Sequence, residues 1–541
     1  MEKKIVLFIV LSVGIIVGTS YFFPAPKKNP PVKVVPMVSP EKPANPEKGV
    51  LPPPQEPAFT GSPGSEEKRI RVNTPLYQAT LSNRGAVIRQ WELKTYQEKD
   101  GKTEIKLLKD ETGLYPLSVE VKDDNSYFIK GVYALEGEDL FLDETKKAGT
   151  LTFLLKDPAS GRSVQKKLTF HSDSYTVDIE LQTENIPYYE FLLGSNFGIH
   201  EWGDKNSIGF VGPISLIDNK VVKENPAKIH QDIIYEGKSA WTAIQDKYFL
   251  SALIPKNEGL KTIVKSLKEN EVTVGAVVAP GKAAISQESF VLYAGPKKLS
   301  DLSSLHIFLE ETVDFGWFIA GSWSLVRLIA QPLFSILNFL HSYTHNYGVA
   351  IIILTVLIKA LFIPLTHKSY KSMKGMQAIQ PLMAELQKKY KNDKQRLNRE
   401  IMELYKAHKV NPVGGCLPMI LQIPVFVALF NIFNTTIELR QAPFMFWITD
   451  LSDFDPLYVL PVIMGITMFI QQKIQPSNLD PTQAKIMLFL PVIFTFFFLK
   501  FSSGLVLYWM VNNILSIAQQ FITARYFANG GKTLSRAGKK G

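Results

Sequence analysis

The chain has 541 residues, a hydrophobic content of 46% and a net charge of +10, and this length is sufficient for three or four structural units. Its single cysteine, Cys416, excludes an intramolecular disulfide and any cysteine-based metal cage, and we interpret it as an inert buried thiol. The positive charge alone could indicate a nucleic-acid-binding protein. However, the basic stretches flank apolar segments, which is typical of the cytoplasmic loops of membrane proteins.

The N-terminal region is predicted to be a membrane anchor followed by a tether. Two lysines precede the apolar run 5–23, which is long enough to span a bilayer and lacks a small-x-small cleavage site. We therefore expect 1–23 to be an uncleaved signal anchor with a cytoplasmic N-terminus; a removed signal peptide is the alternative. Residues 24–64 contain 13 prolines, a composition that predicts an extended periplasmic linker without a core.

Residues 65–310 are predicted to form a large periplasmic β-sandwich domain, because many short strand-like segments occur with few helical periods. The segment 76–93 indicates two strands around a turn, and 175–181 alternates apolar and polar residues as a half-buried strand does. The segments 272–279 and 285–293 suggest a further hairpin.

No catalytic or cofactor site is expected. The glycine-rich segment 194–198 lacks the spacing of a nucleophile elbow, and 530–533 lacks the first glycine of a P-loop. No cluster of His, Asp and Glu shows the spacing of metal ligands. We predict that the protein is not an enzyme, requires no cofactor, and uses the β domain for binding or as a spacer.

Residues 315–340 are apolar with Arg327 as the single charged residue, so hydropathy alone would predict a membrane span. If this segment crossed, the basic loop 368–411, with 11 Lys and Arg residues against four acids, would lie outside. We therefore predict that 311–345 forms an amphipathic helix in the outer interface.

The remaining apolar segments predict five further transmembrane helices. Together with the anchor they give an α-helical polytopic protein with six spans, both termini in the cytoplasm and a basic tail at 528–541. The five predicted spans are 346–367, 412–435, 456–473, 485–501 and 504–527.

The loop 368–411 is predicted to be a basic helical hairpin in the cytoplasm. Apolar residues repeat at helical spacing from Met376 to Leu386 and from Leu397 to Leu404. Asn392 and the following aspartate are a plausible turn between the two helices. The basic faces could bind lipid headgroups or ribosomal RNA; a solvated loop without a partner is the alternative.

Lys359 lies inside an otherwise apolar span. A cation at membrane depth costs about 2.5–3.5 kcal/mol, so it needs a partner or water. Gly348, Thr355 and Lys359 share one helical face, which predicts a wet, protein-lined cavity. Snorkelling of the lysine to the cytoplasmic interface is the alternative.

Polar stripes on the other spans could meet Lys359. They include Gln422 on the third span, Met464 and Gln471 on the fourth, and Trp509, Asn512 and Ser516 on the last. Such side chains often only join helices. However, the five C-terminal spans contain no Asp or Glu, so Lys359 requires hydration, and the carboxylate relay expected of an ion pump is missing.

Three motifs carry a family resemblance. The segments 411–430 (NPVGGCLPMILQIPVFVALF), 438–444 (ELRQAPF) and 503–509 (SGLVLYW) closely resemble the YidC/Oxa/Alb family of membrane protein insertases. The resemblance runs from about residue 315 to the C-terminus, and the anchor with a large external domain matches the Gram-negative form, with a β-supersandwich domain.

The resemblance implies a chaperone of the inner membrane that inserts nascent membrane proteins, alone or with the Sec translocon (SecYEG and SecDF). It implies five core helices around a groove that opens to the cytoplasm and to lipid. The family usually carries an arginine where this chain has Lys359, which keeps the charge but loses the bidentate fork. The expected groove residues are Lys359, Thr355, Gly348, Met464, Gln471, Trp509, Asn512 and Gln422.

The hairpin and the tail resemble the region that receives the substrate and the ribosome, and the expected contacts are Lys368, Lys371, Lys374, Lys388 and Lys389. The hydrophobic segment of a substrate is expected to slide along 425–433 and 489–498 into lipid. A solute transporter and a membrane-anchored scaffold remain as alternative functions.

Overall fold

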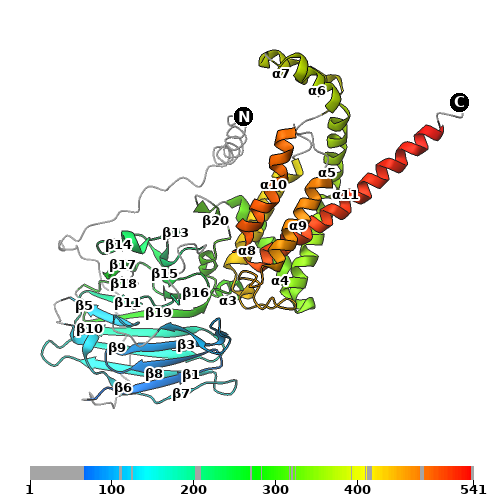
Figure 1. Ribbon diagram of the computed structural model, residues 1–541. Coiled ribbons are helices and arrows are strands. Elements are labelled where there is room, and N and C mark those ends of the chain that lie inside the picture. The colour runs from blue at the N-terminus through cyan, green and yellow to red at the C-terminus, as the bar shows by residue number, and fades with distance from the viewer. Residues whose placement is uncertain are drawn as a thin grey trace. The chain divides into compact units, whose positions relative to one another are not determined.

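A computed structural model describes residues 66–537 except 109–112, 123–125, 201–208, 269–270, 282, 316, 319–320, 323, 392, 409, 411–416 and 475–480. The predicted anchor 1–23, the linker 24–64 and Cys416 lie outside the described residues. The chain divides into two units, Met1–Val313 and Asp314–Gly541, and each is described by itself (Figure 1).

The first unit is built from three sheets whose strands are antiparallel, apart from the parallel pair β1–β7. One five-stranded sheet has the spatial order β4 (Glu104–Leu108), β3 (Val87–Gln97), β2 (Tyr77–Ser82), β1 (Arg69–Asn73) and β7 (Leu140–Phe141). The second has the order β14 (Ile233–Tyr235), β17 (Lys261–Lys268), β18 (Glu271–Val278), β11 (Tyr189–Leu192) and β5 (Ser118–Val121).

The largest sheet has nine strands. Its order is β13 (Lys220–Lys223), β12 (Gly212–Ile217), β15 (Ser239–Gln245), β16 (Phe249–Pro255), β19 (Ile285–Pro296), β10 (Thr176–Glu184), β9 (Ser163–His171), β8 (Ala148–Lys156) and β6 (Ala134–Glu136). Short helical segments connect the strands: α2 (Tyr127–Lys130), η1 (Pro226–Lys228), α3 (Leu299–Ser303) and η2 (Leu309–Thr312).

The core lies between sheets. Phe191 of β11 packs against Phe290 of β19, with ring centroids 5.0 Å apart, and this contact joins a five-stranded sheet to the nine-stranded one. Along β10, buried residues alternate with more exposed ones, as the sequence pattern predicted. The prediction of a large β-sheet domain is thereby confirmed.

One predicted hairpin is present and one is wrong. Strands β2 and β3 pair as predicted, with Tyr77 opposite Leu93. The predicted hairpin of 272–279 and 285–293 does not form, because β18 pairs with β17 and β11 whereas β19 pairs with β10 and β16. Strands β18 and β19 are interior strands of two different sheets. The segment between them therefore connects the two sheets, and packed sheets lie about 10 Å apart.

The second unit is helical. It contains α4 (Ser324–Thr344), α5 (Tyr347–Ala378), α6 (Gln380–Lys389), α7 (Lys394–Ala407), α8 (Leu417–Thr435), η4 (Ile437–Leu439), α9 (Val459–Ile474), α10 (Pro481–Phe498) and α11 (Ser503–Ala537), with the short strands β20 (Trp317–Phe318) and β21 (Gly321–Ser322). Helix α11 packs against α5 and α9, α10 against α9, and α4 against both α5 and α8.

The second unit contains several apolar helices. By length and composition, α4, α5 and α11 could each cross a membrane, and α8, α9 and α10 contain shorter apolar stretches. The interfacial position of α4 therefore stays a prediction. Helix α5 continues past the predicted end of its span to Ala378, and α11 continues to Ala537.

Helices α6 and α7 lie side by side as a helical hairpin joined by residues 390–393. The Tyr390 hydroxyl donates to Glu400 Oε1 across it at 3.4 Å. Asp393 caps α7 by accepting a hydrogen bond from the Arg396 backbone N–H.

Candidate functional site

Lys359 is the charged residue of the candidate site. Its Nζ donates to Ser516 Oγ at 2.6 Å and to Asn512 Oδ1 at 3.2 Å. These two acceptors lie one turn apart on α11, so a single face of that helix receives the lysine from α5. The polar stripe predicted on the last span therefore meets Lys359.

A third helix joins this contact. Gln422 of α8 donates from Nε2 to Asn512 Oδ1 at 3.1 Å and to the Tyr508 hydroxyl at 3.3 Å. Asn512 thus accepts from both the lysine and the glutamine. We refer to Lys359, Gln422, Tyr508, Asn512 and Ser516 as the polar cluster.

Among the residues that the structure describes, no acid neutralises the charge of the polar cluster. Helices α5, α8, α9, α10 and α11 contain no Asp or Glu, and both hydrogen-bond acceptors of Lys359 in the described structure are neutral. A lysine ammonium has three N–H donors, so one remains for water or for a substrate group.

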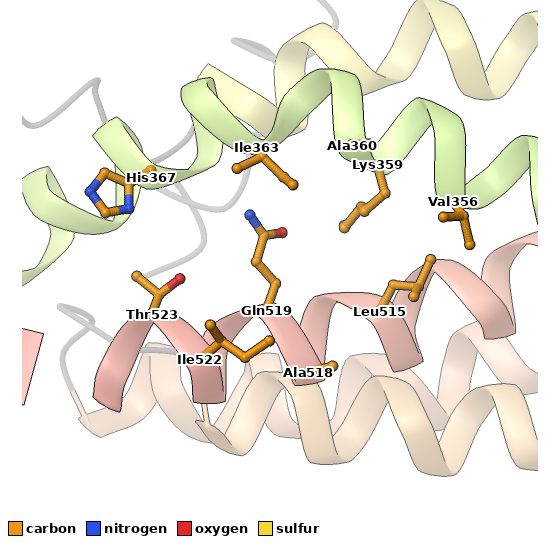
Figure 2. Close-up of a pocket in the computed structure, with 10 residues that line it drawn as sticks. All are labelled: Val356, Lys359, Ala360, Ile363, His367, Leu515, Ala518, Gln519, Ile522 and Thr523. Atoms are coloured by element: carbon orange, nitrogen blue, oxygen red, sulfur yellow. The ribbon is translucent and has the colours of Figure 1, made fainter. Parts of the chain in front are cut away.

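A cavity of about 490 Å³ lies beside Lys359 between α5 and α11. Figure 2 shows the Lys359 and Gln519 side chains in the space between these two helices, with His367 and Thr523 toward one end. The Gln519 amide donates across the gap to the Thr366 hydroxyl. The lining residues are Val356, Lys359, Ala360, Ile363, His367, Leu515, Ala518, Gln519, Ile522 and Thr523.

Two other predicted groove residues of α5 are buried. The Thr355 hydroxyl donates to the Ile351 carbonyl of its own helix at 2.6 Å. Gly348 lies against Phe444, and a Cβ at this position would come within 2.0 Å of the ring. Asn346 holds the same segment by donating to the Phe444 carbonyl at 3.0 Å. This end of α5 is therefore closed by the 440–448 loop.

The α9 residues do not join the polar cluster. Met464 is fully buried, and its backbone carbonyl accepts from Asn513 Nδ2, which also donates to the Thr467 hydroxyl. Gln471 is half-buried, and no hydrogen bond links it to the cluster among the described residues.

Trp509 belongs to an aromatic cluster that bridges three helices. Its ring lies 4.8 Å from that of Phe426 in α8, and 5.1 and 6.2 Å from those of Phe498 and Phe494 in α10. It therefore packs between the predicted third and fifth spans.

The prediction that 425–433 forms an outer sliding face is wrong for most of its residues. From Val427 to Phe433 most side chains of α8 are buried, because α4 packs against this helix. The exposed residues of α8 lie one turn earlier, at Ile420, Leu421 and Ile423. On α10 the prediction agrees better, since Phe489 and Phe496 are exposed.

The predicted basic contacts lie on the extension of α5 and on α6. Lys368, Lys388 and Lys389 are exposed, whereas the Lys374 ammonium lies over the Tyr370 ring at 5.5 Å. Of Lys371 only the backbone position on α5 is described.

Tyr508 and Thr366 participate in the site but were not predicted. Both lie on the polar faces of their helices, Tyr508 one turn before Asn512 and Thr366 two turns after Lys359, and this spacing is the signal that could have identified them.

In the described part of the chain, no group of three His, Cys, Asp or Glu residues could hold a metal ion.

Comparisons with known proteins identify both units. Residues 339–530 match the family described as 60Kd inner membrane protein, and residues 69–336 match the YidC periplasmic domain. The chain is 43% identical over 537 residues to the membrane protein insertase YidC of Geotalea uraniireducens, covering 96% of this chain and 98% of that protein. The insertase YidC of Syntrophus aciditrophicus is 41% identical over 553 residues, with 96% and 99% covered.

A solved structure of an active YidC insertase is also similar, with 17% identity, a TM-score of 0.36, and 95% of this chain and 98% of that chain covered. The full-length relatives decide the assignment. The chain belongs to the YidC family of membrane protein insertases: it is a non-enzymatic, multi-pass protein of the inner membrane, with a helical membrane region and a large periplasmic β-sheet domain, and it inserts membrane proteins.

Proposed function

We propose that the polar cluster is the hydrated end of a groove that receives the polar segment of a nascent membrane protein. The observation that carries this proposal is that Lys359 donates only to neutral oxygens in the described structure. A cation without a counter-ion at membrane depth costs about 2.5–3.5 kcal/mol, and water in the groove would offset this cost. The eight groove residues named above would act unequally, with Lys359, Asn512 and Gln422 at the centre.

A polar or acidic segment would enter from the cytoplasm and replace water at the third N–H of Lys359. The hydrophobic segment would meanwhile move into lipid along the exposed faces of α8 and α10. Burial of that segment, at roughly 25 cal/mol per Å² of apolar surface, would drive insertion without a nucleotide.

We further propose six transmembrane helices, with the anchor 1–23 as the first and with both termini in the cytoplasm. The α6–α7 hairpin and the basic end of α11 would then receive the ribosome and the nascent chain. The β-sheet domain would contact the Sec translocon. The positive-inside rule supports this orientation, because 368–411 carries 11 Lys and Arg residues against four acids.

Replacing Lys359 with Ala and with Arg tests the groove. We expect Lys359→Arg to retain insertion of a Sec-independent reporter with an acidic outer segment. Lys359→Ala should reduce it about fivefold, which corresponds to the loss of about 1 kcal/mol of charge interaction. The measurement is the fraction of reporter that becomes protected from a cytoplasmic protease.

Lys500 provides the control, because it is an exposed lysine that follows α10 and lies outside the polar cluster. Lys500→Ala should insert the reporter as the unchanged protein does. Equal insertion by Lys359→Ala and Lys359→Arg would contradict the proposed role of the charge.

A further inference from the structure

The cavity between α5 and α11 differs from the polar cluster although both include Lys359. Its walls are mainly apolar side chains that are exposed in the described structure, among them Val356, Ile363 and Ile522. Two small residues, Ala360 of α5 and Ala518 of α11, are among its lining residues. We refer to it as the α5–α11 crevice.

The length of the crevice matches one leaflet of a bilayer. The lining residues of α5 run from Val356 to His367, which is about 16 Å along the helix axis. Half of the hydrocarbon core of a bilayer is about 15 Å thick. An extended hydrocarbon chain parallel to the helices would therefore match the crevice in length, and it would pass beside the hydrogen bond from Gln519 to Thr366 that crosses the gap.

The two ends of the crevice differ in polarity. Val356 and Leu515 line the deep end, where the Lys359 side chain also lies, whereas His367 and Thr523 lie at the opposite end (Figure 2). Beyond that end, Lys374 continues the same face of α5, and Arg525 of α11 is exposed. In Figure 1 the α11 ribbon leans away from α5 toward its C-terminal end.

The positive side chains near the mouth favour a negatively charged ligand. Neither α5 nor α11 contains an Asp or Glu. Lys359 lines the crevice, and Lys374 and Arg525 add two positive charges beyond its mouth. An extended polypeptide is a poorer occupant, because its backbone N–H and C=O groups would lack partners along the apolar walls. A hydrocarbon chain needs no such partners.

We propose that the α5–α11 crevice binds one anionic phospholipid, with an acyl chain along the apolar walls and the phosphate at the mouth near His367 and Thr523. Assignment of this lipid to the cytoplasmic leaflet rests on the proposed topology. The binding itself does not, and it is measured without any substrate protein. Its failure would therefore be distinguishable from a failure of the insertion mechanism.

Photolabelling of the full chain in vesicles tests the position of the lipid. The probe is phosphatidylglycerol with a diazirine in one acyl chain, and the labelled peptides are mapped by mass spectrometry. We expect adducts on 356–363 of α5 and 515–522 of α11 at about five times the yield on the exposed α10 residues Phe489 and Phe496, a ratio that one added cation at the mouth can supply. Equal yields on α10 would overturn the proposal.

Competition tests the charge selectivity. Unlabelled phosphatidylglycerol should suppress the crevice adducts about fivefold more effectively than phosphatidylethanolamine. Arg525→Gln should reduce this difference, and Lys500→Gln, which removes a charge outside the crevice, should leave it unchanged. Equal competition by the two lipids would overturn the selectivity for an anion.

Filling the crevice tests the acyl site. Ala360→Phe should reduce phosphatidylglycerol retention, measured by native mass spectrometry, about tenfold, because several methylene contacts are lost. Leu361→Phe is the matched control, since Leu361 is exposed on the same helix and does not line the crevice. Equal retention in the two variants would overturn the proposal, as would crosslinking of the crevice to a nascent chain with lipid excluded. The photolabelling result decides if Ala360→Phe fails to fold.

Discussion

The Lys359 ammonium donates to two neutral oxygens of α11, Asn512 Oδ1 and Ser516 Oγ. An arginine could present a planar fork that matches a carboxylate, whereas a lysine offers a compact charge with rotatable donors. In this chain, recognition of a substrate would therefore depend on charge and hydration more than on bidentate geometry. Gln422 supports the arrangement, because it shares Asn512 as an acceptor.

At the end of α5 that the 440–448 loop closes, Gly348 has no side chain, and this allows the Phe444 ring to pack against the helix. We expect Gly348→Ala to lower the free energy of unfolding of the helical unit by about 1–3 kcal/mol, because the new Cβ would overlap the Phe444 ring. Thermal unfolding of the purified protein measures this change.

A smaller residue at position 444 should relieve the overlap. The double variant Gly348→Ala with Phe444→Leu is therefore expected to recover part of the lost stability. Gly375→Ala is the control on the same helix, since its Cβ would approach Val410 only to 3.3 Å. Equal effects of the two glycine substitutions would contradict the proposed packing.

The centre of the site was predictable at the residue scale because helical spacing alone places Asn512 and Ser516 on one face. The position of Gly348 was not, because its contact comes from a loop almost a hundred residues away. The burial of Lys166 in the β-sheet domain was likewise not predictable, because its hydrogen-bond acceptors are distant in the sequence. Lys166 is fully buried and donates to the backbone carbonyls of Gly85, Ala86 and Leu117, whereas its neighbour Lys167 pairs with Glu180 at the surface.

At the element scale, the segments β18 and β19 were identified correctly but paired incorrectly. Their apolar patterns and the Pro280-Gly281 turn signal are local properties. The register of β19 is fixed by β10, from Ile285 opposite Glu184 to Tyr293 opposite Thr176, and such long-range pairing has no local signature. The helical hairpin was easier to predict because its periodicity and its turn lie within one segment.

The basic face of the α6–α7 hairpin carries a prediction about the ribosome. Lys388→Glu with Lys389→Glu should weaken ribosome binding and reduce its dependence on salt, because phosphate contacts release counterions. Sedimentation of the purified protein with ribosomes at two or more salt concentrations measures both effects.

Lys473→Glu provides the comparison, since Lys473 is exposed at the end of α9 and lies outside the hairpin. The prediction fails if the hairpin substitutions leave both the affinity and the salt dependence as they are in this control.

At the scale of the whole molecule, the chain separates into Met1–Val313 and Asp314–Gly541, and the polar cluster lies entirely in the second unit. Deletion of 60–310 is therefore expected to leave insertion of a Sec-independent reporter close to that of the full chain. Reporters that require the Sec translocon should lose more, because the β-sheet domain is the proposed contact. Loss of Sec-independent insertion in a stably folded deletion variant would contradict this division of labour.

The central claim is that water from the cytoplasm reaches the polar cluster. Ser516→Cys in a Cys416→Ser background places a thiol at the position of an acceptor of Lys359, and Leu361→Cys places one on an exposed apolar position of α5. The measurement is the rate of modification by a membrane-impermeant thiol reagent, applied separately from each side of inner-membrane vesicles. We predict that the cysteine at 516 reacts from the cytoplasmic side much faster than the cysteine at 361, whereas equal protection of both, or reaction only from the periplasmic side, would contradict the hydrated groove.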